Sequence, residues 1–247
     1  MDFGLKDKRA LVLGGTSGLG LAIAKCLKAE GARIVVASRQ IARVKAIAAE
    51  LSGEGVALDI TQEQSLREGI ERIMGGGEVD IVVNNVGGPA AGNPTEIKLE
   101  DWDRGYAALL RSLIITSQLL VPAMRRRGWG RILNITSTSA KEIIPKLPIS
   151  STFRAGITAW TKEMAKELGR SGILVNNLLP GPTNTDRLKD LEKKSPVFYR
   201  SMSEESALGR IAEPEEIGRV AAFLCSQANT FITGTDILVD GGYTKAL

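Results

Sequence analysis

The chain has 247 residues and a formal charge of +4, from 32 basic and 28 acidic side chains. A chain of this length can bury a large core, and 43% hydrophobic with 24% charged residues is typical of a soluble globular protein rather than a disordered or fibrous one. The chain contains no histidine, which excludes imidazole acid–base chemistry and histidine-ligated zinc. We therefore expect no metal site.

The mild positive charge does not indicate a nucleic-acid-binding protein. The dense basic run, Arg125 to Arg127 followed by Arg131, stands at a predicted helix end, where cations complement the helix dipole. Cys26 and Cys225 are far apart in amphipathic patterns, which favours reduced, buried thiols and a cytoplasmic protein. The amino terminus shows no signal-like apolar core, so a membrane is not an expected partner, and the mild charge makes nucleic acid an unexpected partner as well.

Short apolar runs alternate with amphipathic helical patterns along the chain. The runs are rich in Val, Ile and Leu, which is typical of strands buried on both faces. They occupy residues 10–13, 33–37, 55–58, 81–83, 131–135, 174–178 and 237–239. The helical patterns occupy residues 19–29, 41–51, 64–73, 101–127, 152–168 and 215–224. Right-handed crossovers place such helices on both faces of a parallel sheet, so we predict a doubly wound, Rossmann-type α/β fold of seven parallel strands in one domain, residues 1–247.

Residues 181–211 show neither pattern. This segment is charged and contains Pro196. We therefore predict that it is irregular and forms a mobile flap over a site.

A glycine-rich loop, Gly14-Gly15-Thr16-Ser17-Gly18-Leu19-Gly20, follows the first predicted strand and precedes the first helix. In such a loop Gly14 permits a tight turn, Gly18 lets the backbone approach a pyrophosphate, and Gly20 allows close helix packing, with the phosphate on the helix amino terminus. The alternative is a tight turn without a ligand. The strand–loop–helix order favours dinucleotide binding.

The end of the second predicted strand favours NADP(H) over NAD(H). The chain reads Ala37-Ser38-Arg39 there, without the carboxylate that binds the ribose hydroxyls of NAD. The Arg39 guanidinium is suited to pair with the 2′-phosphate and to stack on the adenine. The alternative is a solvated surface arginine.

These motifs resemble those of the short-chain dehydrogenase/reductase family over nearly the whole chain, and within it the β-ketoacyl carrier-protein reductases. The nucleotide loop matches, although Leu13 replaces the usual threonine, and Asn84-Asn85-Val86-Gly87 resembles the family's Asn-Asn-Ala-Gly. Asp59 and Ile60 resemble the adenine contact, Pro180-Gly181 with Thr183 resembles the segment beside the nicotinamide carboxamide, and residues 234–242 resemble the last strand and turn. The resemblance implies a cofactor site made of Gly14, Thr16, Ser17, Gly18, Leu19, Gly20, Ser38, Arg39, Asp59, Ile60, Asn85, Val86, Gly87, Pro180, Gly181 and Thr183.

The catalytic positions are filled differently from the family's Asn, Ser, Tyr and Lys, in which Tyr exchanges a proton with the substrate oxygen while Lys lowers its pKa and binds the ribose. Ser137 matches the serine, but Ser150 stands at the tyrosine position, Arg154 at the lysine position and Leu109 at the asparagine position. A serine hydroxyl is a far weaker acid than a phenol, and arginine stays charged near neutral pH. Ser150 is therefore expected to be a poor proton donor, and Arg154 does not supply a proton.

Three other residues are alternative proton donors. Tyr106 precedes Leu109 by one helical turn on the same face of a regular helix, and Lys141 and Lys146 lie in the loop after Ser137. A packed tyrosine and solvated lysines are the plainer interpretation of these residues.

Three kinds of function stay open at this point. The first is an NADP(H)-dependent oxidoreductase, similar to 3-oxoacyl carrier-protein reductases, that moves a hydride between nicotinamide and a carbonyl or alcohol substrate. Ser137 polarises the oxygen, Ser150 or an ordered water completes the proton path, and Arg154 orients the cofactor or an anionic substrate. The substrate is expected to be acidic or an acyl thioester, because Arg154 is otherwise a desolvated, unpaired charge.

The second is a catalytically degenerate nucleotide-binding sensor or scaffold, and the third is a lyase or isomerase that uses the cofactor structurally. The helical segments 101–127 and 152–168 resemble the dimerising helices of the family. The resemblance therefore implies a homodimer or homotetramer.

Overall fold

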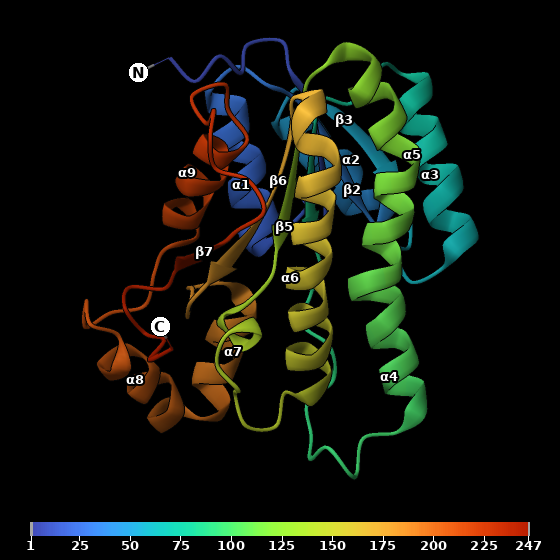
Figure 1. Cartoon of the computed structure of the whole chain (residues 1–247). Coiled ribbons are helices and arrows are strands. Elements are labelled where there is room, and N and C mark those ends of the chain that lie inside the picture. The colour runs from blue at the N-terminus through green and yellow to red at the C-terminus, as the bar shows by residue number, and fades with distance from the viewer. Residues whose placement is uncertain (1, 247) are drawn as a thin grey trace.

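A parallel sheet with helices on both faces forms the centre of the computed structural model, which describes residues 2–246 (Figure 1). The strands are β1 (Arg9–Leu13), β2 (Arg33–Ser38), β3 (Glu54–Ala57), β4 (Ile81–Asn85), β5 (Gly130–Ile135), β6 (Ile173–Pro180) and β7 (Asp236–Val239). They lie in the order β3-β2-β1-β4-β5-β6-β7, and every neighbouring pair is parallel. This confirms the predicted doubly wound, Rossmann-type fold.

Helices cover both faces of the sheet, as Figure 1 shows. One face carries α1 (Gly18–Ala29), α2 (Ile41–Glu50) and α9 (Pro214–Leu224), and the other carries α3 (Glu63–Gly75), α4 (Leu99–Tyr106), α5 (Ser112–Arg127) and α6 (Pro148–Leu168). Alternate residues of β1 enter opposite cores: Ala10 and Val12 lie in one, Leu11 and Leu13 in the other. Because both faces of β1 are buried, its sequence is a continuous apolar run.

The strand order reverses at β1, which pairs with β2 on one side and with β4 on the other. In doubly wound sheets, ligands bind at the carboxyl ends of the strands where the order reverses. The register places Leu13 of β1 opposite Asn84 of β4, and Asn84 opposite Asn134 of β5. The ends of these three strands are therefore the floor of the candidate site.

The prediction that residues 181–211 are irregular is wrong. The segment contains α7 (Asp186–Lys194) and α8 (Pro196–Glu205), which pack against each other. Pro196 is the first residue of α8, where a helix needs no backbone N–H donor, so it begins a helix instead of preventing one. In Figure 1 both helices lie beyond the carboxyl ends of the strands, where they cover this edge of the sheet.

The helix from α4 to α5 is continuous but contains a π-helical turn at Ala107–Arg111. A π turn holds more residues than an α turn and therefore shifts the helix phase. Leu109 is 2% exposed, whereas Tyr106 is 42% exposed and its ring packs against Phe153 of α6. Tyr106 thus lies nearer the surface than Leu109, and the regular helix that the prediction assumed is interrupted between them.

The segment Leu99–Arg127 is long and apolar enough, by length and composition, to cross a membrane. Its most apolar part is 61% buried within the protein, and the core helices of soluble proteins meet the same criteria. Arg125 and Arg127 lie in its last turn, which confirms the predicted helix end. Their guanidinium groups form ion pairs with Glu167 and Glu78.

The two cysteines are free thiols. Cys225 is buried just after α9, as predicted, and burial raises the pKa of its thiol to about 12. Cys26 on α1 is only partly buried, so the prediction of a buried thiol is wrong for this residue.

Candidate functional site

The glycine loop between β1 and α1 has a backbone that only glycine accommodates. Gly14 and Gly18 have φ angles of +62° and +51°. A Cβ atom on Gly20 would lie 2.2 Å from the carbonyl oxygen of Gly14 and 2.6 Å from Nδ2 of Asn85. The Asn85 amide donates to the Gly14 carbonyl oxygen at 3.2 Å and so ties the loop to the end of β4.

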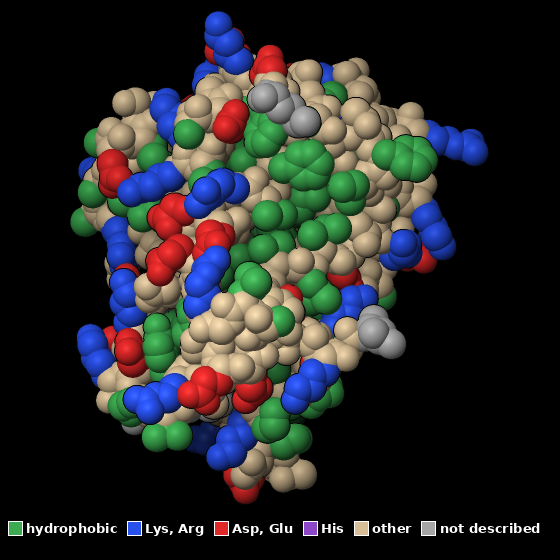
Figure 2. Space-filling model, turned by 90° about the vertical axis from the view of Figure 1, so that its left-hand side faces the viewer, with side chains coloured by type: hydrophobic (Ala, Val, Ile, Leu, Met, Phe, Trp, Pro, Cys, Tyr) green, Lys and Arg blue, Asp and Glu red, His purple; other side chains and the backbone are tan. Residues whose placement is uncertain are grey.

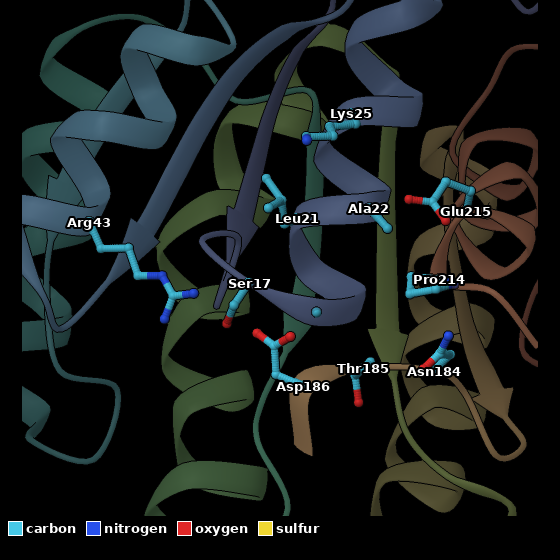
Figure 3. A pocket seen from close by; sticks show the side chains of 11 residues that line it. Ser17, Leu21, Ala22, Lys25, Arg43, Asn184, Thr185, Asp186, Pro214 and Glu215 are labelled. Atoms are coloured by element: carbon cyan, nitrogen blue, oxygen red, sulfur yellow. The ribbon is translucent and has the colours of Figure 1, made fainter. Parts of the chain in front are cut away.

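The amino terminus of α1 has the character of an anion site. Ser17 is the N-cap residue, but its hydroxyl caps no backbone N–H, and the first turn contains no acidic side chain. The first N–H groups and the positive end of the helix dipole therefore face the space in front of the loop. The Asp186 carboxylate points from the start of α7 toward Ser17 (Figure 3). An anionic group thus faces the helix terminus that favours one.

A cleft of about 200 Å³ separates the loop from the start of α7 and the start of α9 (Figure 3). Thr185 faces the loop: a Cβ on Gly18 would lie 3.4 Å from its Cγ2 atom. The Thr183 hydroxyl, by contrast, donates to the carbonyl oxygen of Gly181 at 2.9 Å. The full lining is Ser17, Gly18, Leu21, Ala22, Lys25, Arg43, Asn184, Thr185, Asp186, Pro214 and Glu215.

Sequence reasoning missed Arg43, Thr185 and Asp186. Figure 3 shows the Arg43 side chain reaching from α2 toward the same space as Ser17 and Asp186. Their proximity depends on how α2 and α7 pack on the sheet, and no local pattern encodes that packing.

The end of β2 carries the residues that favour a 2′-phosphate. The Thr16 hydroxyl donates to the Ser38 hydroxyl at 3.1 Å, which joins the glycine loop to β2. Arg39 follows, exposed and without an ion pair among residues 2–246. Asp59, after β3, uses its Oδ1 atom to accept from the N–H and hydroxyl of Thr61, so one carboxylate oxygen caps a turn.

The remaining cofactor candidates lie at the same edge of the sheet. Gly87 is exposed, with open space where a Cβ would stand, and Val86 packs against the cluster that contains Leu109. Gly181 follows Pro180, the last residue of β6, and its N–H donates to the carbonyl oxygen of Val239 at 3.0 Å. Leu19 and Ile60 pack against the two cores.

Hydrogen bonds link three serines and an arginine after β5. Ser137 Oγ accepts from the Ser139 N–H at 3.1 Å, and the hydroxyls of Ser139 and Ser150 lie 3.0 Å apart. Arg154 donates from Nε to Ser150 Oγ at 3.1 Å and from Nη1 to the Ile135 carbonyl oxygen at 3.0 Å. The three predicted catalytic residues thus lie together. Sequence reasoning missed Ser139, although the run of hydroxyl residues after the strand was a signal for it.

Arg154 is 5% exposed and has no carboxylate partner within the described part of the chain. Its Nη2 atom has no hydrogen-bond partner there either. Burial, and then the charge of Arg187, lowers the pKa of Arg154 from 12.5 to about 10. The side chain is therefore cationic at neutral pH, buried and incompletely satisfied.

The alternative proton donors are placed elsewhere. The Lys141 ammonium lies 2.9 Å from the carboxylate of Asp236, whose side chain is 3% exposed. Lys146 is exposed at a positive φ of 65° in the loop before α6. Neither lysine, nor Tyr106, hydrogen-bonds to Ser150 in residues 2–246. The described residues also contain no cluster of His, Cys, Asp or Glu that could hold a metal ion.

The residues present fit a nicotinamide dinucleotide. The first turn of α1 has no side-chain cap and no acidic residue of its own, which suits a pyrophosphate, and glycine at position 20 lets the helix begin directly against the loop. The chemistry of Ser38 and Arg39 suits a ribose phosphate. A polar chain that includes Ser137 and Arg154 lies at the adjacent strand ends.

A family model described as Enoyl-(Acyl carrier protein) reductase matches residues 14–244. The 3-oxoacyl-[acyl-carrier-protein] reductase of Aquifex aeolicus is 33% identical over 98% of this chain and 99% of its own. The gluconate 5-dehydrogenase of Gluconobacter oxydans is 30% identical over 99% and 98%. The solved structure of L-sorbose reductase from Gluconobacter frateurii, complexed with NADPH and L-sorbose, superposes with a TM-score of 0.96 at 31% identity and covers 100% of both chains.

Proposed function

Because the chain belongs to the short-chain dehydrogenase/reductase family, a family of oxidoreductases, we propose that it is an NADP(H)-dependent enzyme that moves a hydride between nicotinamide and a carbonyl or alcohol carbon. One observation carries this proposal. An open glycine loop at the end of β1 lies two strands from a hydrogen-bonded chain of Ser137, Ser139, Ser150 and Arg154 after β5.

The preference for NADP(H) rests on the end of β2. Ser38 and Arg39 offer a hydroxyl and a cation where an NAD-specific site offers a carboxylate. Arg43 extends from α2 toward the same side of the loop (Figure 3). A phosphate bound there gains charge-assisted hydrogen bonds that NAD(H) cannot make.

When bound, the nicotinamide supplies or accepts the hydride, and the side chains of this chain handle the oxygen. Ser137 Oγ accepts a hydrogen bond from the Ser139 backbone, which leaves its own O–H free to donate to a carbonyl oxygen. Ser150 Oγ accepts a hydrogen bond from the Arg154 Nε–H. The positive charge of Arg154 therefore stabilises the substrate oxygen as that oxygen becomes negative. A water beside Ser150 then supplies the proton that completes the alcohol, either directly or through the Ser150 hydroxyl, which regains its own proton from that water.

The substrate is an acidic carbonyl or hydroxy compound, or an acyl thioester. The names of the relatives give three substrates: a 3-oxoacyl group on its carrier protein, gluconate, and the neutral ketose L-sorbose. For this chain the acidic class is favoured, because Arg154 is a buried cation without a carboxylate partner within the described residues.

We also propose that the protein is a cytoplasmic homodimer or homotetramer. The helices α4, α5 and α6 stand side by side at the surface (Figure 1). Figure 2 shows hydrophobic side chains gathered on the face that carries α9 and β7. Exposed apolar surface of this kind marks interfaces. Light scattering should give two or four times the chain mass of 26.4 kDa, and a mass of one chain would contradict the proposal.

The cofactor is tested by fluorescence titration with NADPH and NADH. We expect NADPH to bind at least about tenfold tighter, and Arg39→Ser to remove most of this difference, since a charge-assisted phosphate contact is worth about 1.5–3 kcal/mol. Arg170→Ser, on the exposed turn before β6, is the matched control. Equal affinities in the unaltered protein would contradict the preference.

The reaction is tested with 3-oxoacyl thioesters and with a matched pair of ketones. Oxidation of gluconate at carbon 5 gives 5-ketogluconate, which differs from L-sorbose only in a terminal carboxylate that replaces a hydroxymethyl group. We expect NADPH oxidation with a carbonyl of this panel, and loss of turnover in Arg154→Ala. Tight NADPH binding without turnover would indicate a nucleotide sensor instead.

A further inference from the structure

Three arginines are buried within residues 2–246, and they differ in how the protein satisfies them. Arg9 forms an ion pair with Glu54 at 2.6 Å and donates to the Ile73 carbonyl oxygen at 2.8 Å. Arg131 donates to four backbone carbonyl oxygens. Arg154 has one carbonyl and one serine hydroxyl as partners, and its Nη2 atom has none in this part of the chain. Arg154 is therefore the buried arginine with the fewest acceptors in the fold, and its Nη2 atom is left for an acceptor from outside it.

A second arginine lies at the next strand end. Arg187, in the first turn of α7, rests on the backbone of Gly88, where a Cβ would lie 1.9 Å from its Nη1 atom. Gly88 follows β4 by three residues, and the Ile135 carbonyl that binds Arg154 ends β5. Since the register pairs Asn85 with Ile135, both guanidinium groups lie at the carboxyl ends of adjacent strands.

Neither cation forms an ion pair with an acidic side chain within the described residues. Within the described residues Arg187 has no ion pair and no hydrogen bond, and its charge contributes to the lowered pKa of Arg154. Two like charges at neighbouring strand ends repel each other, and the buried one is desolvated as well. A bound carboxylate offsets both effects, and its planar shape matches the donors of a guanidinium.

We propose that Arg154 and Arg187 together bind a carboxylate of the substrate, an inference that rests on the proposed oxidoreductase function. The substrate class is then small oxo and hydroxy acids, in preference to neutral ketones. Arg154 holds the carboxylate from the floor of the site, and Arg187 from the helical cover formed by α7. Arg187 is a specificity-determining residue, because it does not contact the hydroxyls that act on the carbonyl.

The anion belongs to the substrate rather than to the cofactor for a positional reason. The pyrophosphate has its own site at the open amino terminus of α1, beside β1. Arg154 lies after β5 instead, where its Nε–H is bonded to Ser150. An anion bound to the free Nη2 atom is therefore held by the same guanidinium group that bonds the Ser150 hydroxyl, which is proposed to act on the carbonyl.

The test replaces Arg187 with Met, which keeps the length and removes the charge, and uses Lys189→Met, exposed on the same helix, as the matched control. We measure kcat/KM with 5-ketogluconate and with L-sorbose, and the Kd for NADPH. Arg187→Met should lower kcat/KM for the acid about 10- to 100-fold, mainly through KM, because a charge-assisted pair is lost. The kcat/KM for L-sorbose and the Kd for NADPH should change less than about twofold. Arg187→Lys should recover part of the kcat/KM lost with the acid.

Equal losses with both ketones would overturn the inference, and so would a weaker Kd for NADPH of the same size, which would assign Arg187 to the cofactor phosphates. If neither ketone reacts, the proposed function fails, but the arginine pair is still testable by calorimetric titration of tartrate into the NADPH complex. Tartrate binding that disappears in Arg187→Met and persists in Lys189→Met supports the pair. No tartrate binding in the unaltered protein overturns it.

Discussion

Arginine side chains are buried at both ends of the sheet, but their hydrogen-bond partners differ between the two ends. At the amino-terminal end, Arg9 begins β1 and Arg131 lies near the start of β5, and carboxylate or carbonyl oxygens surround both guanidinium groups. At the carboxyl end, Arg154 keeps a nitrogen without a partner among the described residues, next to Arg187. The first two arginines are part of the fold. The third is arranged for an acceptor that the fold does not supply.

Replacing Arg131 with Met should have the largest effect on stability. The substitution leaves four backbone carbonyl oxygens without their donor. We expect the free energy of unfolding to fall by about 3 kcal/mol or more, since each buried acceptor left unpaired costs about 1 kcal/mol or more. Urea denaturation monitored by circular dichroism measures this change. A loss below about 1 kcal/mol would show that the two ends of the sheet do not differ as described.

Replacing Arg154 with Met should act in the opposite direction on stability. The variant removes a buried, incompletely paired charge and keeps an apolar side chain of similar length, so we expect the free energy of unfolding to rise by about 1 kcal/mol. Turnover should fall at least about 100-fold, because the charge beside Ser150 is lost. The same urea series measures stability. A destabilised Arg154→Met variant would contradict the view that this charge is held for a ligand.

The pH dependence of stability should sharpen the same contrast. Burial lowers the pKa of Arg154 to about 10 from 12.5, so between these values the unfolded chain binds more protons than the native one. The unaltered protein therefore gains stability relative to Arg154→Met as the pH rises through about 10. The difference between the urea midpoints of the two proteins should therefore be smaller at about pH 10.5 than at about pH 8. A constant gap would show that the pKa of Arg154 is not lowered by folding.

The smallest expected effect concerns a thiol at the amino-terminal end of the sheet. Cys225 is buried, and burial raises its thiol pKa to about 12, while the Arg131 charge partly opposes this. Thiolate is the reactive form, so a disulfide reagent at about pH 8 should modify Cys26 first and Cys225 only at the rate of unfolding. Arg131→Met should speed the reaction of Cys225, because the destabilised fold opens more often and this outweighs the loss of the charge that favours the thiolate. Equal rates for the two thiols in the unaltered protein would contradict its burial.

Sequence alone predicted the strands and the glycine loop because the patterns that encode both are local. Strands covered on both faces need uninterrupted apolar runs, such as the one in β1. The loop needs glycine where φ is positive and where Gly20 meets the Gly14 carbonyl. These demands act on neighbouring residues, so the sequence records them.

The reaction end was less predictable because its contacts are long-range. Ser139 meets Ser150 across a loop, and Arg187 meets Gly88 only because α7 folds back over the end of β4. The π turn at Ala107–Arg111 has no counterpart in the hydrophobic pattern. Side chains brought together by tertiary packing leave no periodic signal.

Hydride transfer is tested most directly with NADPH that carries deuterium at both positions of nicotinamide carbon 4. After reaction with 5-ketogluconate, mass spectrometry locates the label in the product. The proposed mechanism predicts one deuterium on the former carbonyl carbon for each NADPH oxidised, and no labelled product with Arg154→Ala. Tight NADPH binding without any deuterated product from this ketone or the other carbonyls of the panel would contradict it.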